Sequence, residues 1–269
     1  MNILITNDDG VFAPGILAAK QAVEDLGNVT VVAPAENNSS VGRRLTLFKH
    51  LKITSCKLED NSPAYSVSGS PADSVIVGAD YIMENKPDLV ISGINSGVNI
   101  SADITSSGTV CAALEAVSFG IPAVAASLYV DPKKGYVKDE NGNWQRHYDF
   151  SSAKIVLHNL VEKIIDKGFP EGVNLFNLNV PADCDSYDMK ITKLAPKMIN
   201  KRVIDKTDKD MGEFFNYNLD ERDDEAIMIA PDLVTEYDKD SDGYTVIIKK
   251  RPSLTPLDIN MTSDKLKNW

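Results

Sequence analysis

The hydrophobic residues in the first two thirds of the chain fall into two alternating patterns. Short continuous runs rich in Val, Ile and Leu are typical of strands buried on both faces of a parallel sheet. Apolar residues spaced three and four positions apart predict helices with one buried face. The predicted strands are Asn2–Thr6, Val29–Ala33, Asp88–Ser92, Pro122–Ser127 and Val173–Val180, and the predicted helices are Pro14–Leu26, Ala72–Met83, Val110–Phe119 and Ser151–Lys167. This alternation predicts an α/β fold with a mainly parallel sheet and helices on both faces.

Several predicted helices carry end signals. Ser70 followed by Pro71 is typical of an N-cap and a first helical residue. Ser107 and Ser151 stand where they would cap two later helices, and Gly120 follows one of them as a stop signal. These signals support the predicted boundaries.

The pattern changes in the last third of the chain. Residues 183–225 are strongly charged and show little helical periodicity. Lys190–Leu194 and Tyr244–Lys249 read as strands, Pro252–Leu257 reads as an extended tail, and Asp220–Glu225 is typical of a solvated turn. We therefore expect a β-hairpin or arm region here.

We interpret residues 1–269 as a single domain with a core at 1–182 and an oligomerisation arm and C-terminal tail at 183–269. The last third has too few regularly spaced apolar positions to bury a core of its own. Unpaired strands in such an arm need partners, which predicts a homodimer or a homotetramer made of two dimers. The alternative is an arm that folds back on its own core in a monomer.

Composition narrows the class of protein. A net charge of −11 argues against binding to nucleic-acid polymers or anionic membranes, because no basic excess is present to neutralise phosphates. The three cysteines form neither a zinc pattern nor a disulfide framework. The sequence shows no signal peptide and no membrane-spanning run. We expect a cytoplasmic protein.

The candidate chemistry lies in polar loops that follow predicted strands. Asp8 and Asp9 follow the first strand, Ser39 lies after the second, and Asn95 follows the strand Asp88–Ser92. Because the carboxyl ends of parallel strands meet at one edge of a sheet, these residues should converge. Two adjacent carboxylates repel each other, so a divalent cation is the simplest partner for them. The alternative is an ordinary solvated turn before a helix.

The donor set of this predicted site is two carboxylates, a hydroxyl and an amide. Such hard oxygen ligands suit Mg²⁺, Mn²⁺ or Ca²⁺ and not zinc or copper. Ser107-Gly108-Thr109 opens a helix at the same predicted edge, and its N–H groups would suit a substrate phosphate. The alternative for that loop is a plain N-cap. Arg43 and Arg44 either reach a phosphate or are ordinary surface charges.

Other classes of protein share parts of this pattern. The chain has no dinucleotide-binding or P-loop glycine motif and no serine-hydrolase elbow. A haloacid-dehalogenase phosphatase needs Asp-x-Asp, whereas the two acids here are adjacent. A receiver signalling domain needs an Asp after its third strand, where this chain reads Ser92-Gly93-Ile94-Asn95. A nucleotide-binding protein without catalysis remains an alternative.

Taken in order along the chain, these motifs resemble the SurE (survival protein E) family of metal-dependent nucleoside monophosphate phosphatases. The chain differs from the usual family pattern at Ser101–Asp103 and Ser106 and matches loosely over Lys197–Lys250. The matching segments are Ile3–Val11 with Ala13–Gly15, Val32–Pro34 with Asn37–Ser39, Leu45–Leu47, Gly69–Asp73, Ser92–Gly97, Ser107–Val110 and Ser253–Leu257.

The resemblance implies a Rossmann-like three-layer core and hydrolysis of nucleoside 5′- and 3′-monophosphates, with short polyphosphate as a further substrate. It assigns one divalent ion per subunit to Asp8, Asp9, Ser39 and Asn95, with Mg²⁺ or Mn²⁺ in solution and Ca²⁺ as an occupant in crystals. Asp8 and Asp9 are the catalytic candidates, and either could protonate the leaving oxygen. The resemblance also implies dimers or tetramers with exchange of the C-terminal tail.

Overall fold

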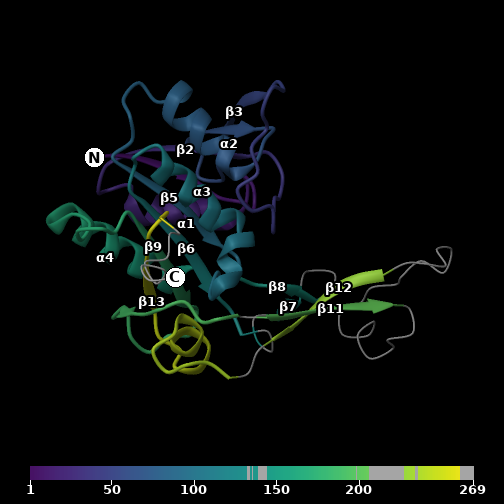
Figure 1. Cartoon of the computed structure of the whole chain (residues 1–269). Helices are drawn as coiled ribbons and strands as arrows, with labels where there is room; N and C mark the ends of the chain where they lie inside the picture. The colour runs from purple at the N-terminus through teal and green to yellow at the C-terminus, as the bar shows by residue number, and fades with distance from the viewer. Residues whose placement is uncertain are drawn as a thin grey trace, which may run out of the picture.

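The computed structural model describes residues 1–131, 134, 136–138, 144–197, 199–205, 227–233 and 236–260. A nine-stranded sheet with the order β10-β13-β9-β6-β5-β1-β2-β4-β3 forms its centre (Figure 1). Most neighbouring strands are parallel, and the antiparallel pairs are β3 with β4 and β13 with β9. The strands of this sheet are β1 (Asn2–Thr6), β2 (Asn28–Pro34), β3 (Ile53–Lys57), β4 (Pro63–Val67), β5 (Leu89–Asn95), β6 (Ala123–Tyr129), β9 (Leu175–Pro181), β10 (Lys190–Ile191) and β13 (Ser253–Leu257).

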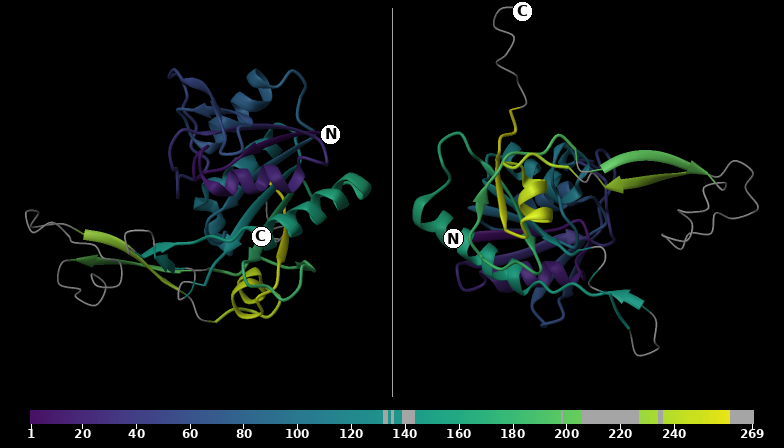
Figure 2. Two further views of the ribbon diagram at one scale, coloured as in Figure 1. Left: turned by 180° about the vertical axis from the view of Figure 1, so that it is seen from behind. Right: turned by 90° about the horizontal axis from the view of Figure 1, so that it is seen from below.

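Helices cover both faces of this sheet, as the sequence pattern predicts (Figures 1 and 2). Ile3 and Ile5 of β1 face one layer, formed by α1 (Pro14–Val23) and α4 (Ser151–Lys167). Leu4 faces the other layer, formed by α2 (Pro71–Val77) and α3 (Gly108–Ser118). All three side chains are fully buried, which explains why β1 reads as a continuous apolar run. The predicted three-layer α/β architecture is confirmed.

The first strand occupies the place where the direction of the chain through the sheet reverses. β1 pairs in parallel with β2 on one side and with β5 on the other. From β2 the chain continues toward one edge of the sheet, and from β5 it continues toward the other. Such a switch point leaves a crevice beyond the carboxyl ends of the strands, where α/β proteins bind their ligands. The turn after β1 begins at that crevice.

The predicted helix ends are mostly confirmed. Ser70 accepts a hydrogen bond from the N–H of Asp73, and the Asp73 carboxylate accepts one from the N–H of Ser70, which closes a capping box. Ser107 caps α3 by accepting from the N–H of Val110 at 3.1 Å. The prediction for Ser151 is wrong, because Ser151 is the first helical residue and not the N-cap, and its own N–H donates to the Asp149 side chain at 2.9 Å.

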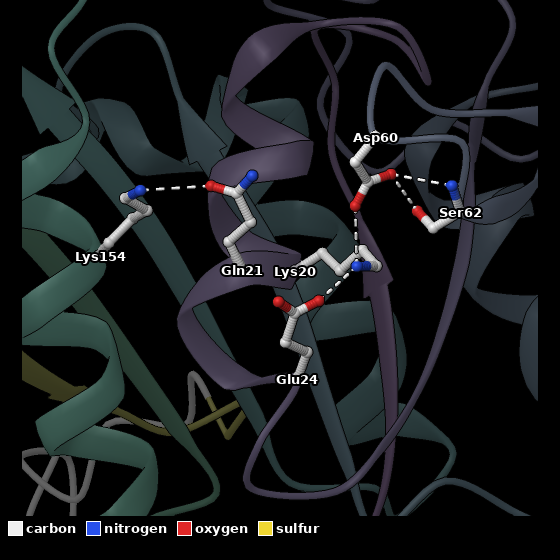
Figure 3. A network of polar contacts seen from close by, with 6 residues as sticks. All are labelled: Lys20, Gln21, Glu24, Asp60, Ser62 and Lys154. Atoms are coloured by element: carbon white, nitrogen blue, oxygen red, sulfur yellow. Dashed lines mark hydrogen bonds and ion pairs between the residues drawn. The ribbon is translucent and has the colours of Figure 1, made fainter.

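Polar contacts fix α1 from both sides (Figure 3). Lys20 bonds Glu24 one turn further along the helix and reaches Asp60, in the β3–β4 turn, at 2.9 Å. Gln21 accepts a hydrogen bond from Lys154 of α4 at 3.2 Å. These contacts join three elements that are distant in sequence, so α1 has a fixed position behind the turn that follows β1.

The sequence pattern missed the pair β3 and β4 at one edge of the sheet. β3 has three exposed residues among its five, so it lacks the apolar run of a buried strand. β4 begins at Pro63, and proline is common at the first position of a strand because it has no N–H to donate.

The helix predicted at Ala72–Met83 is α2 followed directly by a π-helix, η1 (Gly78–Ile82).

Two predictions for the last third need correction. Tyr244–Ile248 is a π-helix, η3, and not a strand, because its apolar run packs Val246 into the core and short apolar runs do not distinguish the two states. Pro252–Leu257 is extended as predicted, but β13 pairs with β9 of the same chain and so lies in the central sheet rather than in a free tail. β10 covers only the first two residues of the predicted strand Lys190–Leu194.

A two-stranded hairpin projects from the core (Figures 1 and 2). It consists of β11 (Ile199–Asp205) and β12 (Ile227–Leu233), joined antiparallel by seven residue pairs. A second small hairpin, β7 (Tyr136–Lys138) with β8 (Trp144–Arg146), lies between β6 and α4. The predicted turn at Asp220–Glu225 lies outside the described residues.

Cys56, Cys111 and Cys184 are all free thiols. Within the described residues, none of the helices has both the length and the apolar character that a bilayer-spanning segment requires.

Candidate active site

The turn after β1 is held in shape by Asn7 and Gly10. The Asn7 side chain donates to the Gly10 carbonyl at 2.9 Å and accepts from the Gly10 N–H at 3.2 Å. Gly10 has φ = +106°, a conformation that residues with a side chain rarely adopt. Asp8 and Asp9 lie inside this closed turn, so their positions are determined by the backbone.

Asp8 is buried against the start of α3. The residue is 5% exposed, and its carboxylate accepts a 2.6 Å hydrogen bond from the Thr109 hydroxyl. A Cβ added to Gly108 would lie 2.8 Å from Asp8 Oδ2, so only glycine leaves room for this carboxylate. Burial raises the pKa of Asp8 to about 6; the Thr109 hydrogen bond opposes this shift and the charge of Asp9 adds to it.

Asp9 connects the loops that follow β5 and β2. One of its oxygens accepts from the N–H of Ser96 at 3.0 Å, and the other accepts from the Asn37 side chain at 3.4 Å. The Asn38 N–H also donates to the carbonyl of Asp8 at 2.7 Å. The loops that carry Ser39 and Asn95 therefore meet at the Asp8–Asp9 pair, as the parallel sheet predicts.

Ser39 and Asn95 have oxygen lone pairs that could bind a cation. The Ser39 hydroxyl donates its proton to Asn37 Oδ1 at 2.7 Å. The Asn95 side-chain N–H₂ donates to the Gly97 carbonyl at 2.8 Å, which leaves the amide oxygen for another partner. Asn37 thus joins Ser39 to Asp9, a role that its sequence position alone did not reveal.

The chemistry of this donor set fits a hard divalent cation. No lysine or arginine forms an ion pair with Asp8 or Asp9 in the described part of the chain. Nor does that part contain a cluster of three or more His, Cys, Asp or Glu side chains, so a cation here needs neutral oxygen ligands as well. Two carboxylates with a hydroxyl and an amide oxygen meet that need.

The residues predicted to bind phosphate already have partners inside the protein. The Ser107 oxygen caps its own helix, and the Thr109 hydroxyl donates to Asp8. What this loop can offer an anion is therefore mainly the backbone N–H groups at the start of α3, an 11-residue helix whose N-terminus carries partial positive charge.

The two neighbouring arginines have different environments. Arg43 forms a 2.5 Å ion pair with Glu115 of α3, whose side chain is only 4% exposed. Arg44 is exposed and instead donates to the Asn38 side chain at 3.1 Å. The sequence did not indicate this division, because the buried partner lies 72 residues from Arg43.

Comparison with known proteins identifies relatives over the whole chain. A family model described as survival protein SurE matches residues 3–201. The 5′-nucleotidase SurE of Methanosphaera stadtmanae is 39% identical over 270 residues, covering 100% of this chain and 99% of the relative. That of Methanobrevibacter smithii is 41% identical with the same coverage. The crystal structure of the SurE protein from Aquifex aeolicus superposes with a TM-score of 0.75 at 31% identity, covering 99% of this chain and 97% of the other.

Proposed function

The chain belongs to the SurE family, and on that basis we propose that it is a metal-dependent 5′-nucleotidase that hydrolyses nucleoside monophosphates to nucleoside and phosphate. The observation that carries the proposal is the meeting of three strand-end loops and the start of α3 at the Asp8–Asp9 pair. The relatives named as 5′-nucleotidases cover essentially the full length of the chain.

Asp8, Asp9, Ser39 and Asn95 would hold one divalent cation, Mg²⁺ or Mn²⁺. Bound there, the ion would polarise the phosphate and offset negative charge that develops during hydrolysis. The backbone N–H groups at the start of α3 would orient the phosphate. Asp8 or Asp9 would move the proton between water and the leaving oxygen, and Thr109 keeps the Asp8 carboxylate in a single orientation.

The test is phosphate release from 5′-AMP by purified protein. We expect turnover with Mg²⁺ or Mn²⁺, loss of turnover in EDTA, and recovery when excess Mn²⁺ is added back. A protein that releases phosphate from neither a mononucleotide nor a generic phosphate monoester under any of these conditions would show that the proposal is wrong.

The same proposal includes a homodimer, or a tetramer of two dimers, formed through the β11–β12 hairpin. In the described part of the chain these two strands pair only with each other, and their outer edges keep unpaired backbone groups. Two-stranded ribbons are marginally stable alone, so pairing with a second copy would stabilise the hairpin. β13 already has neighbours in its own chain on both sides, so exchange of that strand is not part of the proposal.

Light scattering at micromolar concentration measures this directly. We expect at least twice the chain mass of 29.4 kDa for the full chain, and the monomer mass after the hairpin is replaced by a short linker. A full-length protein at the monomer mass would contradict the association.

The three free cysteines support a reducing, cytoplasmic setting, which we include in the proposal.

A further inference from the structure

An open pocket of about 470 Å³ adjoins the candidate active site and shares only Ser39 with the four proposed cation ligands. Asn37 and Ser39 form one wall of the pocket, and the same loop contacts Asp9 through Asn37. Ser68 and Gly69, after β4, form another wall. A substrate whose phosphate lies at Asp8 and Asp9 could therefore extend past Ser39 into this space.

Arg44 is held in this pocket at both ends. Its backbone carbonyl accepts a hydrogen bond from the hydroxyl of Ser70, the fully buried N-cap of α2, at 2.5 Å. Its guanidinium donates to the Asn38 side chain at 3.1 Å. The loop before Arg44 is fixed as well, because the Gly42 N–H donates to the Ser106 carbonyl at 3.1 Å. The Arg44 guanidinium thus lies against the loop that carries Asn38, within the lining of the pocket.

The lining of the pocket indicates the kind of group that it accepts. Glu36 and Arg44 contribute one negative and one positive charge, so the pocket as a whole does not favour a second phosphate or a polyphosphate chain. Val41 supplies apolar surface, while Asn38 and Ser68 supply neutral polar groups. A flat heterocycle with hydrogen-bonding edges matches this combination, and a planar guanidinium can pair with base acceptors or stack on a base.

We propose that this pocket binds the nucleoside part of the substrate and that Arg44 contacts the base. The inference rests on the proposed function, because it assigns the distal part of the same substrate. Arg44 is then a specificity-determining residue, which distinguishes nucleotides from other phosphate monoesters without touching the reacting phosphate.

The test compares four substrates in wild type, Arg44→Ala and Arg44→Lys. In Arg44→Ala we expect KM for GMP and AMP to rise about tenfold, the effect of losing one specific base contact. KM for ribose 5-phosphate and p-nitrophenyl phosphate should stay within about twofold, because neither carries the base.

Arg44→Lys keeps the charge but not the planar fork, so it should show the same selective loss. Arg251→Ala, an arginine bonded to the Asp188 carbonyl away from the pocket, is the matched control.

An equal rise in KM for all four substrates, or full recovery with lysine, would overturn the base contact. Calorimetric binding of guanosine in EDTA separates this inference from the proposed function. Wild-type protein that binds guanosine through Arg44 but releases no phosphate would overturn the function alone. Protein that hydrolyses all four substrates with similar KM and shows no Arg44-dependent guanosine binding would overturn the pocket assignment alone.

Discussion

Asp8 shows how one residue can be positioned for binding at the expense of folding stability. Its carboxylate is buried, lies beside a second carboxylate and has no cationic side chain as an ion-pair partner in the described part of the chain. The Thr109 hydrogen bond and the N-terminus of α3 recover only part of the lost hydration, which is why the pKa is raised to about 6. A bound cation would restore the missing charge balance.

This account predicts an unusual effect of Asp8→Asn on stability. In EDTA the folded protein binds more protons than the unfolded chain between about pH 4 and 6, so the Asp8 carboxylate lowers the free energy of unfolding as the pH rises through that range. The full cost, about 3 kcal/mol at most, applies above pH 6. Asp8→Asn should therefore be more stable than wild type at pH 7.5 and equal to it near pH 4, measured by urea unfolding.

Adding Mn²⁺ at pH 7.5 should reverse the order, because the cation stabilises wild type and has little effect on the variant. Wild type that is already the more stable protein at pH 7.5 in EDTA would contradict the assigned cost of the buried carboxylate.

At the scale of elements, the close approach of α3 to the β1 turn is the contact on which the site depends. A Cβ at Gly108 would lie 2.7 Å from Asp8 Cβ, so Gly108→Ala must displace the helix start or the carboxylate. We expect a loss of roughly 1–3 kcal/mol in unfolding free energy and at least a tenfold loss of kcat/KM. Ser118→Ala, at the exposed last residue of the same helix, should change neither value. Activity and stability of Gly108→Ala equal to wild type would show that this packing is unimportant.

The elements that sequence predicts best are those whose signals are local. Ser70 and Ser107 cap their helices as expected, since N-capping depends on residues three positions away. Tyr244–Ile248 and β3 depend on tertiary burial and on an edge position, which leave no local pattern. The site shows the same contrast between features with local sequence signals and features that depend on tertiary contacts.

The order of strands and loops brings the Asp8, Ser39 and Asn95 loops together, because parallel strands place their carboxyl ends on one edge. Contacts between side chains distant in sequence could not be predicted this way. The bond from Thr109 to Asp8 spans 101 residues, and the pair of Arg43 with Glu115 spans 72.

At the scale of the whole molecule, Asp242 joins the base of the hairpin to the site. Its buried carboxylate accepts from the N–H groups of Ser101, Ala195 and Gly243 at 2.8, 2.9 and 2.7 Å. Ala195 precedes β11 and Asp242 follows β12, while Ser101 begins the turn of 3₁₀-helix (η2, Ala102–Ser106) that leads into α3. Both ends of the hairpin are therefore anchored on the loop that precedes the start of α3.

Asp242→Ala would leave three buried N–H groups without their acceptor. We expect a loss of roughly 3 kcal/mol or more in the free energy of unfolding, measured in urea. Asp240→Ala is the matched control, because Asp240 pairs with Lys193 where both side chains are exposed, and its unfolding midpoint should equal that of wild type. Equal stability of the two variants would contradict the role assigned to Asp242.

The central claim is that the Asp8–Asp9 pair holds the cation that makes this chain a phosphatase. The most direct measurement is the rate of phosphate release from 5′-AMP by Asp9→Asn at saturating Mn²⁺, with folding verified by circular dichroism. Asn keeps the shape of Asp9 and the oxygen that Ser96 contacts, but removes the charge. We predict that turnover falls at least a hundredfold in a folded protein. Full activity in folded Asp9→Asn would contradict the account.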